Sequence, residues 1–231
     1  MEYVNSEICK QNCRKRLKTE LPGDKEMISS KKHEYVFSAP FCTNLSFAVW
    51  LIDDYTQKEP LGKTRVSLKE ENIKAVKNLS GYYTFSGLRN GIYTLAVDPE
   101  LYFPEEKIVD TSLYSKLKEP VIEILLRPRP LYSFPDRATL LRGMLDTGSL
   151  SLEELKTDIT LKLIPKKEQK KAGLEVAGAP DERGEFVLYF RDNIKGKNDF
   201  ILWIKGRGIE KKLPEVVEEG KSTSAGLIPI F

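Results

Sequence analysis

The sequence has little of what most catalytic sites and metal centres need. Its 231 residues include one histidine, His33, and three cysteines, Cys9, Cys13 and Cys42. A serine or cysteine nucleophile requires a neighbouring base, and one histidine near the N-terminus offers almost none. The spacing Cys9-x-x-x-Cys13 has no second cysteine pair to complete a zinc site, so we interpret the cysteines as free thiols in a reducing compartment. We therefore expect no enzyme activity, no catalytic residues, no metal and no cofactor.

Long apolar runs, phosphate-binding motifs and segments of one charge sign are also missing. No segment approaches the roughly 20 apolar residues that span a bilayer, and no signal-peptide pattern opens the chain. We therefore expect a cytoplasmic protein without membrane insertion, which a particle released by lysis could carry outside. Neither G-x-x-x-x-G-K-[ST] nor G-x-G-x-x-G occurs after a strand. The 37 basic and 34 acidic side chains are interspersed, which argues against a nucleic-acid partner.

Adjacent carboxylates are present, but their positions do not suggest catalysis. They include Asp53-Asp54, Glu70-Glu71, Glu105-Glu106 and Glu153-Glu154. Neighbouring residues in a strand point to opposite faces, and these pairs lie near expected turns. We interpret them as solvated charge rather than as the acid and base of a catalytic pair.

What the sequence does contain is a series of short segments with apolar residues at every second position. Its 15 glycines and 13 prolines separate these segments, a pattern typical of β structure. In the first half we predict strands at 45–53, 64–68, 82–85, 92–97 and 121–127. In the second half we predict strands at 138–145, 158–164, 185–190 and 200–205, with 227–231 as a final strand or a docking segment. The first strand is apolar on both faces, which predicts a central or doubly covered position, and it should form a meander with 64–68.

Prolines divide the chain. Pro128, Pro130 and Pro135 follow one another closely after the strand at 121–127, and we place a domain boundary there. The resulting parts are a charged, mostly disordered N-terminal arm (1–35), a β-sandwich module (36–130) and a second β-sandwich module (131–231). Two short helices are considered, a partner-docking helix at 6–17 as the alternative to disorder, and one at 149–155 opened by a capping-box pattern.

Two glycine motifs of the first half resemble a known family. Residues 59–68 read EPLGKTRVSL, and residues 78–95 read NLSGYYTFSGLRNGIYTL. These segments resemble the carboxypeptidase regulatory-like modules, and the resemblance implies a transthyretin-like (prealbumin-like) antiparallel β-sandwich. Residues 181–188, DERGEFVL, take the place of the start of the 78–95 motif, NLSGYYTF, in a diverged second copy. In this copy Asn198-Asp199-Phe200 stands where the family has its second glycine and tyrosine.

The motif residues have a structural interpretation. Glycines supply turn geometry, while aromatic and aliphatic side chains supply a core. Arg89-Asn90-Gly91 predicts a tight connection between 82–85 and 92–97, because Asn and Gly tolerate the positive φ that short hairpin turns need. The structural set is Gly81, Tyr83, Phe85, Leu88, Gly91, Tyr93, Leu95, Gly184, Phe186 and Leu188.

The expected function is therefore non-catalytic. The resemblance implies an interaction protein whose tandem modules dock onto a larger protein assembly, and an accessory component of a phage-tail-like contractile injection particle is one candidate. The alternative is a carbohydrate-binding or adhesive surface module, which would use exposed rings such as Tyr55, Tyr102, Phe103 or Tyr132. An enzyme would need a site that the sequence does not reveal.

Overall fold

The computed structural model describes residues 44–114, 116–146, 148, 159–166, 175–191, 194–206 and 208–230. The expected N-terminal arm, His33, the cysteines and both candidate helices lie outside these residues. Within them the chain is all-β apart from the short helix α2 (Thr111–Tyr114), which confirms the predicted all-β class. The expectation of wholly antiparallel sheets is wrong, because the strand at 45–53 pairs parallel with 121–126, and the strand at 140–146 pairs parallel with 222–229.

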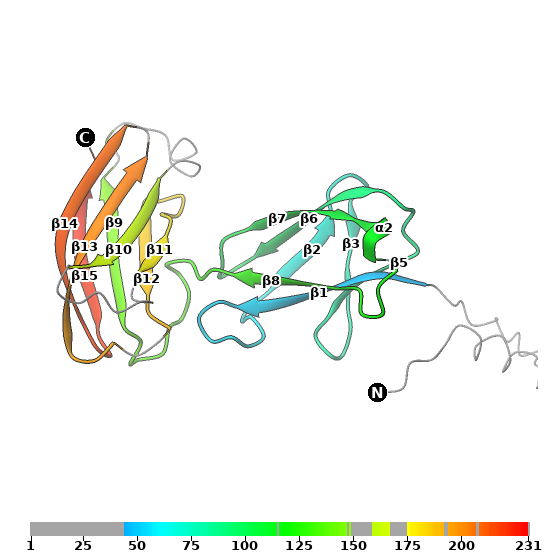
Figure 1. The fold of residues 1–231 in the computed structure, drawn as a ribbon, viewed down its shortest axis with the longest axis horizontal. Coiled ribbons are helices and arrows are strands. Elements are labelled where there is room, and N and C mark those ends of the chain that lie inside the picture. The colour runs from blue at the N-terminus through cyan, green and yellow to red at the C-terminus, as the bar shows by residue number, and fades with distance from the viewer. Residues whose placement is uncertain are drawn as a thin grey trace, which may run out of the picture. The chain divides into compact units, whose positions relative to one another are not determined.

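The first two sheets share one core, and together they are called the first sandwich. Its strands are β1 (Leu45–Asp53), β2 (Thr64–Leu68), β3 (Ile73–Lys74), β4 (Val76–Lys77), β5 (Tyr83–Ser86), β6 (Ile92–Pro99), β7 (Glu105–Asp110) and β8 (Val121–Leu126). One sheet has the order β4-β5-β1-β8 and the other β3-β2-β6-β7. Figure 1 shows β1 and β8 in one layer and β2, β6 and β7 in the other. Buried side chains from both layers, such as Phe47 and Leu95, form a single cluster.

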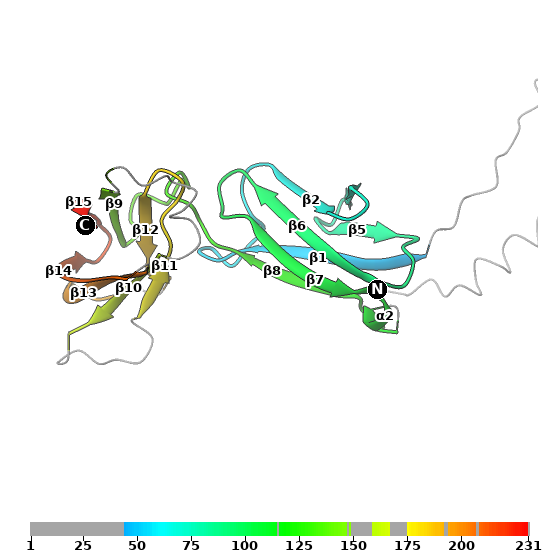
Figure 2. The ribbon, with the colours of Figure 1, turned by 90° about the horizontal axis from the view of Figure 1, so that it is seen from above.

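The next two sheets form the second sandwich. Its strands are β9 (Leu140–Asp146), β10 (Thr160–Pro165), β11 (Val176–Gly178), β12 (Glu185–Tyr189), β13 (Lys197–Gly206), β14 (Ile209–Glu218) and β15 (Ser222–Pro229). One sheet has the order β12-β9-β15 and the other β11-β10-β13-β14, and their facing side chains form a second core that includes Leu161 and Phe200. Figure 2 shows β9 and β12 apart from the layer of β10, β13 and β14.

The two sandwiches have the same strand connectivity. β1 pairs antiparallel with β5 and parallel with β8, and β9 pairs in the same way with β12 and β15. In the opposite sheets, β2 lies between β3 and β6, and β10 lies between β11 and β13; β7 and β14 complete the edges. Only the short strand β4 has no counterpart among the described residues. The described chain is therefore a structural repeat.

The predicted meander is wrong. β1 pairs with β5 and β8, whereas β2 belongs to the opposite sheet, so the connection after Asp53 crosses between layers. The predicted central position of β1 is confirmed, since β5 and β8 flank it in its sheet. The last predicted strand exists but begins earlier, at Ser222.

The sequence patterns missed five strands, all at sheet edges, namely β3, β4, β7, β11 and β14. β3, β4 and β11 have no buried residue, while β7 and β14 bury one residue each, Val109 and Val217, and the rest of each is exposed or partly exposed. Edge strands of this kind present few apolar positions, so their alternation does not stand out in the sequence.

Candidate functional site

Asp53, the last residue of β1, lies in the core. Its relative exposure is 0%. Phe47, Val49 and Leu51 precede it at alternate positions and are buried, and side chains two residues apart share a face of a strand. The alternation that builds the core therefore also carries this carboxylate inside, and the interpretation of Asp53 as solvated charge is wrong.

Hydrogen bonds satisfy both oxygens of the buried carboxylate. The hydroxyls of Tyr132 and Tyr102 donate to Oδ2, at 2.6 and 3.2 Å. The backbone N–H groups of Tyr55 and Thr56 donate to Oδ1, at 2.8 and 3.3 Å. Donors at both oxygens offset the cost of removing a carboxylate from water, which is what permits Asp53 to remain in this position.

Asp54 makes contacts with the second sandwich. The hydroxyl of Tyr189, at the end of β12, donates to Asp54 Oδ2 at 2.6 Å. The guanidinium of Arg191 lies 3.3 Å from Asp54 Oδ1. Two consecutive aspartates thus bind different parts of the chain, because consecutive side chains point in opposite directions. We call Asp53, Asp54, Tyr102, Tyr132, Tyr189 and Arg191 the aspartate junction.

Aromatic rings surround the junction. The ring of Tyr55 lies 5.1 Å from Phe134 and 5.7 Å from Tyr189, between centroids, in edge-to-face geometry. Tyr132 and Phe134, in the connection between the sandwiches, are 4.6 Å apart. Edge-to-face pairs of this kind contribute roughly 0.5–1.5 kcal/mol beyond the burial of their area. The rings therefore add directional packing to the hydrogen bonds.

Two arginines also fix the connecting segment. Arg129 Nη2 lies 3.0 Å from Glu182 Oε2, in the turn before β12. Arg142 of β9 donates from Nη1 to the carbonyl of Pro130 at 2.8 Å, and its guanidinium lies 5.5 Å from the Phe134 ring. Each contact joins the proline-containing connection, or the first sandwich, to the second sandwich.

The electrostatics of the aspartate junction keep its tyrosine hydroxyls protonated, so they serve as hydrogen-bond donors rather than as groups that exchange protons. Burial, together with Asp53, raises the pKa of Tyr102 to about 12. Burial and a hydrogen bond to a carboxylate also raise the pKa values of Tyr132 and Tyr189. These hydroxyls therefore remain protonated donors at neutral pH. No group of three or more histidine, cysteine or acidic side chains with metal-binding geometry occurs among the described residues.

We expect an alkaline loss of stability from these tyrosines. The pKa of Tyr102 is about 12 in the folded chain against 10.0 ordinarily, so the folded state holds its proton more tightly. Stability from this group is complete below about pH 10 and falls as the pH rises toward 12. Ultraviolet absorbance should show exposed tyrosines ionising first, with the remainder ionising together with unfolding. Ionisation of all tyrosines near pH 10 in a folded chain would contradict this.

The structure places the predicted motif side chains in the two cores. Tyr83, Phe85, Tyr93 and Leu95 belong to the first core, with Leu88 packed against it. Phe186 and Leu188 belong to the second core.

The glycines of the motif differ in conformation. Gly81 has φ +86° and Gly184 has φ +80°, values that favour glycine. Neither Asn90 nor Gly91 has positive φ, and the connection from β5 to β6 uses Gly87 instead, at +70°. The hairpin expected at Asn90-Gly91 is wrong because β5 and β6 lie in opposite sheets. Gly91 has another contact, since its N–H donates to Thr111 Oγ1 at 2.9 Å.

Two of the four rings expected to be exposed are buried. The relative exposure is 0% for Tyr102 and 2% for Tyr132, and both belong to the junction. Tyr55 and Phe103 are partly exposed, and the guanidiniums of Arg127 and Arg129 lie 5.9 and 5.6 Å from the centroid of the Phe103 ring. A sugar-binding surface built on Tyr102 and Tyr132 is therefore ruled out.

Comparisons with known proteins give little beyond this geometry. No family model matches the chain, and no curated protein matches it. One similar solved structure is described as the Bacillus anthracis TIE protein, with 17% sequence identity and a TM-score of 0.28. The match covers 80% of this chain and 33% of that chain, so this chain spans about a third of that protein. No helix of the described residues is long and apolar enough to cross a membrane.

Proposed function

We propose that this chain is a non-catalytic structural protein whose two tandem β-sandwiches form a rigid unit that docks onto a larger protein assembly. The observation that carries the proposal is the aspartate junction. Its carboxylates accept hydrogen bonds from Tyr102, Tyr132 and Tyr189, and thereby fix the connection between the sandwiches. A chain that only tethered two independent modules would not need buried charge at their connection.

The fold supports a finer assignment within this proposal. Both sandwiches repeat one strand connectivity, and the glycine motifs at 59–68 and 78–95 resemble those of carboxypeptidase regulatory-like modules. We therefore propose two transthyretin-like modules with the bounds 36–130 and 131–231, preceded by an arm at 1–35. A cytoplasmically assembled particle of the phage-tail-like contractile kind is the assembly that the sequence favours.

Rigidity at the junction can be measured directly. The double variant Tyr189→Phe, Arg191→Gln removes both partners of Asp54 while keeping side chains of similar size. We expect the intact chain to tumble as one body, with one rotational correlation time for both sandwiches in backbone ¹⁵N relaxation. The double variant should give two shorter correlation times, because the hydrogen bond and ion pair to Asp54 are lost.

A matched control tests whether the change in tumbling comes from the aspartate junction rather than from the loss of any ion pair. Lys162→Gln removes an ion pair to Glu175 that lies within the second sandwich, 3.1 Å long and exposed to solvent. This variant should tumble like the unmodified chain. Separate correlation times in the unmodified chain itself would overturn the rigid unit.

Docking onto an assembly needs its own experiment. Sedimentation of a native extract of the source cells should place the chain in a large-particle fraction, and chemical cross-linking should link it to the same neighbour in repeated preparations. Recovery of the chain only as a free monomer, under all salt and pH conditions used, would contradict the proposal.

A further inference from the structure

The two sandwiches differ at one edge, despite their shared connectivity. In the second sandwich β11 pairs with Leu161, Lys162 and Leu163, near the start of β10. Its Gly178 lies so close to β12 that a Cβ there would be 2.6 Å from Leu188 Cδ2. The space between the sheet edges is therefore filled by β11.

The corresponding edge of the first sandwich is open. β3 pairs only with Ser67 and Leu68, at the far end of β2, and leaves the first residues of β2 without a strand neighbour on that side in the described chain. A groove of about 520 Å³ occupies this place. Val66, Ala75 and Tyr83 contribute to its lining.

Backbone hydrogen-bonding groups face the groove. The carbonyl of Lys63 accepts from Glu100 N–H, on the side of β6, so the backbone groups of Lys63 point away from the groove. Because direction alternates along a strand, the N–H and C=O of Thr64 point to the open edge. Val66 confirms this alternation, since its carbonyl accepts from Ala75 N–H on the same edge at 2.9 Å.

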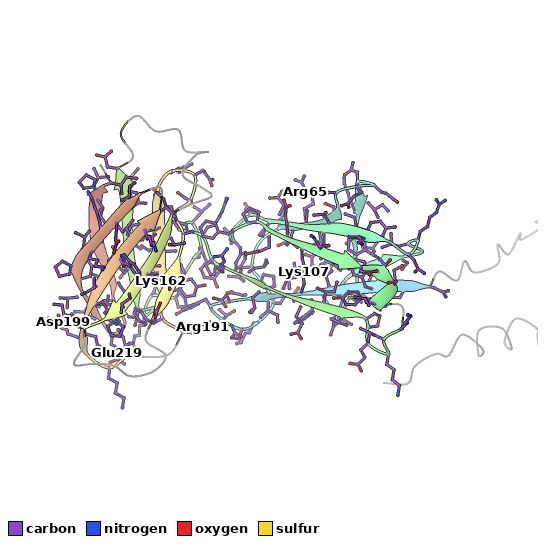
Figure 3. All side chains as sticks on the ribbon, turned by 45° about the horizontal axis from the view of Figure 1, so that its top comes forward. Arg65, Lys107, Lys162, Arg191, Asp199 and Glu219 are labelled. Atoms are coloured by element: carbon purple, nitrogen blue, oxygen red, sulfur yellow. The ribbon has the colours of Figure 1, made fainter. Side chains whose placement is uncertain are left out.

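Basic side chains line the same groove. Lys63, Arg65 and Lys74 contribute to its walls, together with the carboxylates of Asp98 and Glu100. Arg65 lies 4.0 Å from Asp98. Within the described part of the chain, no carboxylate forms an ion pair with Lys63 or Lys74. Figure 3 labels Arg65 on β2 and Lys107 on β7, strands that β6 separates.

We infer that this groove binds an extended acidic segment of a partner protein, which adds as a short strand along Thr64 and directs carboxylates toward Lys63 and Lys74. An open strand edge supplies backbone pairing, and cations beside it select acidic side chains. The inference rests on the proposed docking function and names the chemistry of the partner. In the described part of the second sandwich, β11 fills the equivalent edge.

Fluorescence anisotropy with the full chain tests the groove. The probe is a labelled synthetic peptide of alternating glutamate and threonine, and the comparison peptide carries N-methyl groups at alternate backbone nitrogens. We expect Lys63→Glu, Lys74→Glu to weaken binding of the first peptide by about tenfold or more through charge reversal. The control Lys107→Glu, Lys118→Glu changes the net charge equally on exposed residues elsewhere and should retain binding.

The outcomes separate the possible causes. Loss of binding on N-methylation supports strand addition, because the modified peptide keeps its charge but loses backbone donors. Equal binding of the N-methylated peptide, or of an oligouronate, would show a general polyanion surface and overturn the inference. Absence of binding by the first peptide would also overturn it, while the sedimentation and relaxation results for the proposed function would stand unaffected.

Discussion

Replacing Asp53 with alanine is expected to lower the free energy of unfolding of the first sandwich by about 3 kcal/mol or more. The change removes the acceptor of Tyr102 and Tyr132 hydroxyls and of two backbone N–H groups. A buried donor left without an acceptor costs about 1–3 kcal/mol, and several are left at once. Denaturant titration in a Trp203→Phe background, in which Trp50 reports on the first sandwich, measures the effect.

Asparagine at position 53 should not restore the stability. Its single carbonyl oxygen can serve either the tyrosine hydroxyls or the backbone N–H groups, and its NH₂ then faces the other donors. Asp54→Asn is the matched control, because Asp54 is less completely enclosed and has Tyr189 and Arg191 as partners. We expect its cost to be about 1 kcal/mol. Equal stabilities of Asp53→Ala and the unmodified chain would show that the junction has no structural role.

Local alternation predicted most strands because it reports directly on burial. β1 and β2 begin and end where the pattern places them, since Phe47, Val49 and Val66, Leu68 mark one buried face in each. The same pattern indicated that Asp53 is buried, because Asp53 lies an even number of residues after Phe47 and so points to the same face of β1. Treating charge as solvated by default hid this signal, although a single acid at an inward position suggests a buried acceptor.

The sequence carries no comparable pattern for contacts between residues that are far apart in the chain. Tyr189 binds Asp54 across 135 positions of sequence, and nothing near either residue indicates the other. Sheet membership was equally hidden, since a strand's own alternation does not identify its neighbours. For this reason β1 and β2 were expected as a meander, and β5 and β6 as a hairpin, although each pair spans two sheets.

The glycine positions show which part of a turn motif the sequence can determine. A glycine is required where φ is positive or where another atom occupies the place of a Cβ. Gly184 meets both conditions, because its φ is +80° and a Cβ there would lie 2.8 Å from the carbonyl oxygen of Leu145. Its own carbonyl accepts from Leu145 N–H at 2.8 Å, so the backbone cannot move away without breaking the pairing of β12 with β9.

Gly184→Ala is therefore expected to destabilise the second sandwich by about 3 kcal/mol, with backbone strain and the contact to Leu145 contributing together. Gly196→Ala is the matched control, since Gly196 has φ +67° but no atom within 4 Å of the added Cβ. Its cost should be about 1 kcal/mol from strain alone. Denaturant titration in a Trp50→Phe background, with Trp203 as the reporter, measures both. Because the two variants share the same backbone strain, the difference between them isolates the steric contact, and equal costs would show that β9 and β12 can separate locally at little expense.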